Sequence, residues 1–171
     1  MAAVKASGPW RAIAASLALV LLLGCGEAGD AGAGEGRQPA PSFSLASLAG
    51  GDVSLESLAG RPAIIDFWAT WCAPCIRQIP VLNALQDRHG GGVSVLGIAV
   101  DVSGAEIVAP FAEEHGIEYT VLIGDQRLAQ EFGAVGFPTL FVLDTEGAIV
   151  ESHVGVASLD ELEEALERAG S

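Results

Sequence analysis

Residues 63–75 decide the fold, and they read Ala-Ile-Ile-Asp-Phe-Trp-Ala-Thr-Trp-Cys-Ala-Pro-Cys. The first six are almost all apolar and include two adjacent isoleucines, a pattern typical of a strand buried on both faces. Residues 74–88 follow with apolar side chains at helical spacing, and residues 93–100 form a second apolar run. This order of strand, helix and strand predicts a right-handed crossover between parallel strands.

Further helix and strand patterns alternate along the rest of the chain. We expect Pro110 to divide one helix or to start its main turn, because an interior proline loses a hydrogen bond and clashes. Ser158 and Glu161 form the capping box of the last helix. The expected elements are helices over 105–115, 127–132 and from 159 onward, and strands over 43–45, around 53, and over 119–123, 139–143 and 148–154. They predict an α/β fold with a central mixed β-sheet, helices on both faces and an N-terminal β-hairpin extension.

The N-terminus has the composition of an export signal. Lys5 and Arg11 precede an uncharged run over residues 13–23, which is too short to span a bilayer. The run ends in Leu-Leu-Gly followed by Cys25, which is similar to the bacterial lipobox. We therefore expect residues 1–24 to be a lipoprotein signal peptide and Cys25 to carry the lipid. A transmembrane helix and a plain secretory signal are the alternatives.

A tether and one folded domain are expected after the signal. Residues 26–40 contain no large apolar side chain, so they cannot offset the entropy cost of folding. We interpret residues 25–40 as a lipidated N-terminus with a flexible tether. Residues 41–171 then form the folded part, which is long enough for one domain and its core.

The charge balance excludes one class of partner and limits another. Eight Lys and Arg against 22 Asp and Glu give a formal net charge of −14, which would repel a nucleic-acid backbone. A chain with this negative charge has no electrostatic attraction to an anionic membrane. Membrane attachment would therefore depend on the acyl chains of Cys25, each buried methylene contributing about 0.8 kcal/mol.

Two cysteines lie where the first strand passes into the first helix. Cys72 is at the start of that helix, where unpaired amides and the helix dipole stabilise a thiolate, so it is the candidate nucleophile. Cys75 lies one turn further on and can attack Cys72 in a mixed disulfide, forming a Cys72–Cys75 disulfide. It is the candidate resolving thiol.

Other uses of the two cysteines remain open at this point. A zinc site needs about four ligands, and His89, His115 and His153 supply no evident set, so we assign no metal. A permanent structural disulfide would close only a small ring, with a correspondingly small entropic gain. Two unrelated cysteines are the third alternative.

The motif and its surroundings resemble the thioredoxin superfamily. The resemblance rests on residues 66–75, on Pro80, and on the Gly-Phe-Pro-Thr sequence at 136–139. The export signal, with the segments 40–43, 60–62 and 115–117, is similar to the membrane-tethered TlpA-like and ResA-like thiol-disulfide oxidoreductases. The resemblance implies a thioredoxin-like fold over essentially the whole domain.

It also implies a substrate groove beside the cysteines. Pro138 matches the family's cis-proline, and the backbone of Phe137 would pair with an extended substrate. Trp71 would shield the disulfide and touch the substrate, and Pro74 lies between the two cysteines. These four residues are the candidate groove, whereas Pro80 is expected to kink the first helix.

Asp66 matches the buried acid of thioredoxins, and burial would raise its pKa and suit it to exchange a proton with Cys75. The alternative is an aspartate that faces solvent at the strand end. The closer subfamily often has a neutral residue at this position and a glutamate three places after the second cysteine. This chain has Gln78 there, so Asp66 is the expected proton acceptor.

These residues predict an exported, membrane-tethered thiol-disulfide oxidoreductase that needs no cofactor. It would reduce disulfides in exported proteins on the periplasmic side of a bacterial envelope, as a monomer, and regain electrons from a membrane thiol carrier. The resemblance implies a role in cytochrome c maturation or copper-site assembly. One alternative is a peroxiredoxin-like peroxidase, although Ala69 and Ile65 stand where that class needs a threonine or serine and a proline. Another is a module that binds copper(I) without catalysis.

Overall fold

The computed structural model describes residues 37–170 of the chain. The predicted signal peptide, Cys25 and the tether up to residue 36 lie outside the described residues. Within the described part, no helix is both long and apolar enough to cross a membrane.

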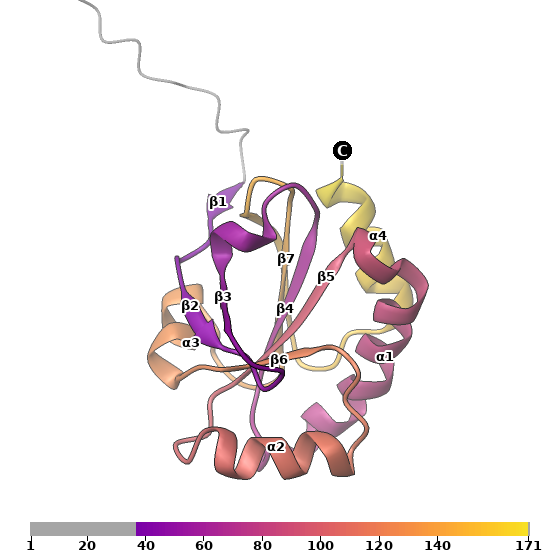
Figure 1. Ribbon diagram of the computed structural model, residues 1–171. Helices are drawn as coiled ribbons and strands as arrows, with labels where there is room; N and C mark the ends of the chain where they lie inside the picture. Colours follow the sequence, from indigo (N-terminus) through magenta and orange to yellow (C-terminus); the bar gives the residue numbers. More distant parts are fainter. Residues whose placement is uncertain (1–36, 171) are drawn as a thin grey trace, which may run out of the picture. The chain divides into compact units, whose positions relative to one another are not determined.

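The centre of the domain is a six-stranded mixed sheet with the strand order β1-β8-β7-β4-β5-β6 (Figure 1). Strands β4, β5 and β6 are parallel, whereas β7 is antiparallel to β4 and β8, and β1 is antiparallel to β8. The strands are β1 (Gln38–Pro39), β4 (Ala63–Trp68), β5 (Ser94–Ala99), β6 (Thr120–Ile123), β7 (Thr139–Leu143) and β8 (Ala148–Val154). The predicted parallel crossover from β4 to β5 and the mixed sheet are confirmed.

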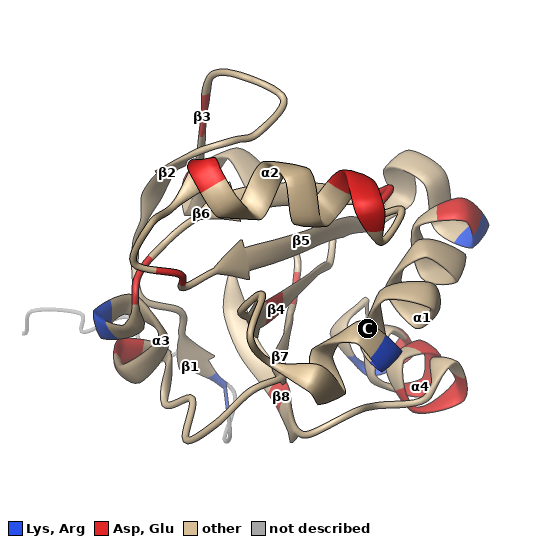
Figure 2. Cartoon of the chain, turned by 90° about the horizontal axis from the view of Figure 1, so that it is seen from below, with Lys and Arg blue, Asp and Glu red and all other residues tan. Residues whose placement is uncertain are grey.

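Helices cover both faces of this sheet, as predicted. They are α1 (Ala73–His89), α2 (Ala105–Glu114), α3 (Gln126–Phe132) and α4 (Leu159–Ala169), with short 3-10 turns at Leu55–Leu58 and Gly90–Gly92. Figures 1 and 2 show α1 and α4 together on one side of the sheet and α3 on the other. Figure 2 also shows acidic residues on the helices α2, α3 and α4.

Two adjacent aromatic residues of β4 anchor the two faces, because successive side chains of a strand point in opposite directions. The ring centroids of Phe67 and Phe132 on α3 are 5.1 Å apart. Those of Trp68 and Phe111 on α2 are 5.4 Å apart. Pro110 lies inside α2 and does not divide it, since burial of Val108 and packing of Phe111 hold the helix together around the missing hydrogen bond.

The predicted N-terminal hairpin is present as a separate two-stranded antiparallel sheet, β2 (Ser44–Ala46) and β3 (Asp52–Ser54). Residues just after β2 reach the edge strand β6. Ser47 forms an antiparallel bridge with Leu122, and the Leu48 amide donates to the Val121 carbonyl (3.0 Å). The hairpin is therefore attached to the outer edge of the main sheet.

The last residues of the predicted tether differ from expectation. Gln38 and Pro39 pair with Ile149 and Ala148 of β8, and Ala40 is buried, with its amide donating to Gly147 (3.2 Å). Main-chain groups at the edge of a sheet accept a strand whatever its side chains. A composition without large apolar residues therefore did not prevent pairing.

The closing helix begins as the sequence predicts. The Ser158 hydroxyl accepts from the Glu161 amide (3.3 Å), and the Glu161 carboxylate accepts from the Ser158 amide (2.7 Å). The Ser158 hydroxyl also donates to the Glu161 carboxylate (2.7 Å), and this bond, followed by that from the Ser158 amide, lowers the pKa of Glu161. Leu162 and Leu166 are buried beneath the helix. The capping box and the apolar stripe thus set where α4 starts and which face it packs.

Candidate active site

The two cysteines form a disulfide at the start of α1. Cys72 is the N-cap residue and Cys75 lies in the first turn, with an S–S distance of 2.01 Å and a Cα–Cα distance of 5.4 Å. Pro74 between them is in the first turn, where a missing amide costs no helical hydrogen bond. Cys72 is 5% exposed and follows Trp71, which is 63% exposed, so the disulfide lies just beneath the surface.

Hydrogen bonds to a residue beyond the end of β5 hold the segment that leads into the cysteines. The Thr70 amide and hydroxyl both donate to the Asp101 carboxylate, at 3.1 and 2.7 Å. The Cys72 amide donates to the Ala69 carbonyl (3.0 Å). Asp101 is buried, and our sequence analysis missed it. Its signal was an acid two residues after the buried strand β5, whose carboxyl end lies beside that of the parallel strand β4.

A second loop, just before β7, reaches the segment that carries the cysteines. The Phe137–Pro138 peptide bond is cis, as the resemblance implied. The Pro138 carbonyl accepts from the Gly155 amide (2.8 Å), which ties the loop to the end of β8. The ring centroids of Trp71 and Phe137 are 5.8 Å apart, and the two rings meet nearly edge to face. The structure thus brings the cysteine segment and the cis-proline loop side by side.

Asp66 lies in the middle of the sheet, beside Gly97 of β5 and Leu140 of β7, and is 1% exposed. Its Oδ1 atom has no hydrogen-bond partner among residues 37–170. Burial raises the pKa of Asp66 well above its usual range. Burial, and then the charge of Asp66, also raise the pKa of Tyr119. The alternative of a solvent-facing aspartate is therefore wrong.

This burial predicts that Asp66→Asn stabilises the protein at neutral pH. Above the ordinary pKa of an aspartate, the unfolded chain has lost its proton while the folded chain still keeps it. The stability of the wild type therefore falls as pH rises, until pH passes the raised folded pKa. Each pKa unit by which the folded state exceeds the unfolded state can lower the free energy of unfolding by about 1.4 kcal/mol. Asparagine removes this loss.

Denaturant unfolding of both proteins in the disulfide form, from pH 4 to pH 8, checks this prediction. We expect the two free energies of unfolding to converge near pH 4 and to separate as pH rises, with the variant more stable. Parallel pH profiles would show that Asp66 ionises freely in the folded protein.

Gln78, on α1, is a second polar side chain that is fully buried. It is 0% exposed, and its Oε1 accepts from the Ala157 amide in the β8–α4 connection (2.8 Å). Its Nε2 has no partner within the described part of the chain. Gln78 thus joins the helix of the cysteines to the connection that also braces Pro138.

The three histidines contact residues other than the cysteines. His89 contacts Glu163 (2.7 Å), His153 contacts Glu151 (3.0 Å), and His115 stacks on Phe111 with ring centroids 3.9 Å apart. Over residues 37–170, no three His, Cys, Asp or Glu side chains gather where they could hold a metal ion.

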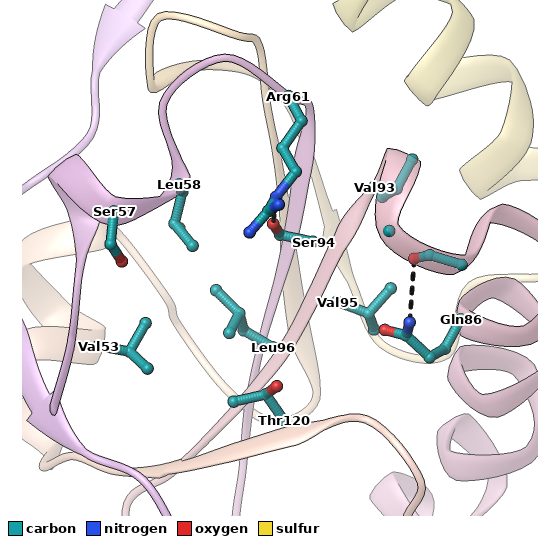
Figure 3. Close-up of a pocket in the computed structure, with 12 residues that line it drawn as sticks. Val53, Ser57, Leu58, Arg61, Gln86, Val93, Ser94, Val95, Leu96 and Thr120 are labelled. Atoms are coloured by element: carbon teal, nitrogen blue, oxygen red, sulfur yellow. Dashed lines mark hydrogen bonds between the residues drawn. The ribbon is translucent and has the colours of Figure 1, made fainter. Parts of the chain in front are cut away.

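A pocket of about 370 Å³ lies at the other end of the parallel strands (Figure 3). Leu58, Val95 and Leu96 supply apolar walls, and the Arg61 Nε donates to the Ser94 hydroxyl at its rim (2.6 Å). Arg61 precedes β4, whereas the disulfide follows the end of β4. The pocket is therefore separate from the dithiol.

A thioredoxin-like domain with a disulfide at a helix N-terminus, beside a cis-proline loop, is a thiol-disulfide oxidoreductase by class. Comparison with known protein families and relatives supports this class. The model of the AhpC/TSA family matches residues 37–152, and the chain belongs to that family.

Named relatives point to the same chemistry. The chain is 33% identical over 142 residues to the thioredoxin-like protein YneN of Bacillus subtilis (strain 168), covering 81% of this chain and 82% of that protein. It is 32% identical over 127 residues to the thiol-disulfide oxidoreductase ResA of Bacillus thuringiensis (strain Al Hakam), covering 72% of each. Among solved structures, a thiol:disulfide interchange protein of the thioredoxin family from Chlorobium tepidum TLS aligns with a TM-score of 0.67 and 33% identity. That alignment covers 78% of this chain and 96% of that one.

Proposed function

We propose that this protein reduces disulfides in exported proteins through a Cys72/Cys75 dithiol cycle. The Cys72 thiolate attacks one sulfur of the substrate disulfide, and the other sulfur leaves as a thiolate and takes up a proton. The Cys75 thiolate then attacks Cys72, which releases the second substrate thiol. Two electrons pass to the substrate, and the enzyme is left with the Cys72–Cys75 disulfide.

One observation carries this proposal: the Cys72–Cys75 disulfide lies at a helix start, directly beside an exposed aromatic surface. The helix N-terminus favours a thiolate on Cys72 when the disulfide opens. Trp71 and Phe137 offer apolar contact to a polypeptide, and the Phe137 backbone, next to the cis-proline, would pair with an extended substrate. Buried Asp66 is suited to exchange the proton of Cys75.

The location of the reaction follows from the N-terminal sequence. Residues 1–24 would direct export, and a lipid on Cys25 would hold the domain at the outer side of a membrane. A membrane thiol carrier would return electrons to the disulfide. Cytochrome c maturation and copper-site assembly are the two processes in which such a reductant would serve.

The test is a trap with Cys75→Ser in the full-length chain in intact cells. Without the resolving thiol, we expect mixed disulfides between Cys72 and substrate proteins to accumulate in the membrane fraction. Non-reducing electrophoresis followed by mass spectrometry identifies the partners. The double variant lacking both thiols is the matched control and should trap nothing. If the single variant also traps nothing while the wild type is active, the two-thiol cycle is wrong.

A further inference from the structure

The orientation of the Gln78 amide leaves one of its groups without a partner. A backbone amide can only donate, so the Gln78 oxygen must face Ala157 and Nε2 must point elsewhere. In the disulfide form, Nε2 is buried and has no hydrogen-bond partner among residues 37–170. A buried donor without an acceptor is costly and rare in folded proteins. Its presence therefore suggests an acceptor that this redox form does not offer.

Reduction of the disulfide would create such an acceptor. A neutral divalent sulfur accepts hydrogen bonds weakly, whereas a thiolate carries a full charge and accepts strongly. Cys75 and Gln78 are three residues apart on α1, and side chains at that spacing lie on the same helix face. Both side chains are buried. A newly formed Cys75 thiolate would thus lie on the helix face that also carries Nε2.

We propose that Gln78 Nε2 donates a hydrogen bond to the Cys75 sulfur once the disulfide is reduced, and thereby stabilises the resolving thiolate. This inference rests on the proposed dithiol cycle and assigns the group that prepares its second step. A more populated Cys75 thiolate resolves the mixed disulfide faster.

The charged groups around Cys75 make a neutral donor useful there. Asp66 in the middle of β4 and Asp101 after β5 are buried acids of the two neighbouring strands, and Asp101 accepts from Thr70. Helix α4, which packs against α1, places Glu163 near Arg88 at the far end of α1. Negative charge near Cys75 opposes a thiolate, whereas an amide donor stabilises it without adding charge.

The same side chain links the dithiol to the substrate groove. Gln78 holds the Ala157 amide, and two residues earlier the Gly155 amide donates to the Pro138 carbonyl. With Oε1 on the Ala157 amide and Nε2 on the Cys75 sulfur, the Gln78 amide would link the dithiol to the connection that supports the cis-proline. The two parts of the site share one short hydrogen-bonded path.

Two variants separate this role from a structural one. Gln78→Glu keeps an oxygen for Ala157 but loses the donor, whereas Gln78→Leu loses both. The matched control is Gln86→Glu, because Gln86 lies later on α1 and its amide only donates to the Gly90 carbonyl (3.1 Å). The readout is the absorbance difference at about 240 nm between the reduced and disulfide forms of the full chain, followed against pH.

We expect both Gln78 variants to raise the higher of the two apparent thiol pKa values by about one unit, a tenfold loss of thiolate below it. Gln86→Glu should titrate like the wild type. Wild-type titration in Gln78→Glu would leave Gln78 only its bond to Ala157 and overturn the proposal.

If the variants do not fold, the wild type still decides. The Gln78 side-chain NH2 resonances should shift on reduction and follow the Cys75 titration in nitrogen-15 NMR, and resonances that do not move would overturn the proposal. Neither measurement needs a substrate. Failure here therefore leaves the dithiol cycle standing, and failure of the Cys75→Ser trap does not alter these titrations.

Discussion

We expect Cys72→Ser to lower the rate of disulfide reduction to that of the uncatalysed reaction. A serine hydroxyl at the N-cap of α1 keeps its proton at neutral pH, so no nucleophile forms there. Cys75 cannot replace it, because it is 2% exposed and lies behind Cys72 in the first helical turn. The measurement is turnover of a protein disulfide with a dithiol as electron donor.

Cys25→Ser is the matched control for this prediction. It removes the cysteine that takes no part in the cycle and leaves both thiols of the cycle. Its turnover in detergent solution should therefore equal that of the wild type. Activity that survives in Cys72→Ser and disappears in Cys75→Ser would assign the attack to the inner thiol instead.

We expect Gly97→Ala to cost about 2 to 3 kcal/mol of the free energy of unfolding, a typical penalty for overpacking a core. Gly97 pairs with Asp66 in the sheet, and a Cβ atom there would lie 2.8 Å from both Trp68 Nε1 and Tyr119 Cε2. The Trp68 ring is enclosed and cannot move aside without disturbing Phe111. Denaturant unfolding measures the loss.

Gly91→Ala provides the comparison on the surface. Apart from its chain neighbours, no described residue has an atom within 4 Å of the added Cβ position, so we expect a change of no more than about 0.5 kcal/mol. Equal stabilities for Gly97→Ala and Gly91→Ala would show that the space around Asp66 is not closely filled. A β-branched residue at 97 should be worse still, because it carries two further atoms into the same contacts.

The sequence was sufficient for features that depend on local pattern. The unbroken apolar run of β4, the capping box at Ser158, and the placement of Cys72 and Cys75 at a helix start each follow from neighbouring residues. The cis-proline came from the resemblance, because an isolated Phe-Pro pair would favour trans.

Other parts of the site depend on residues far apart in the chain. Thr70 and Asp101 are 31 positions apart, and Gln78 and Ala157 are 79 apart. No local periodicity encodes such pairs, since the sheet order brings them together. The pairing of Gln38 and Pro39 was missed for a related reason, because the hydrogen bonds that form it belong to the main chain and leave no trace in composition.

The residues from Gln38 to Leu48 occupy both outer margins of the main sheet. Gln38 and Pro39 lie against one end of β8, and Ser47 and Leu48 lie against β6. An unpaired margin is where strands of a second molecule add and where aggregation begins. This N-terminal stretch therefore covers part of each margin. It occupies main-chain groups at Ala148 and Ile149 of β8 and at Val121 and Leu122 of β6, where another chain could otherwise pair.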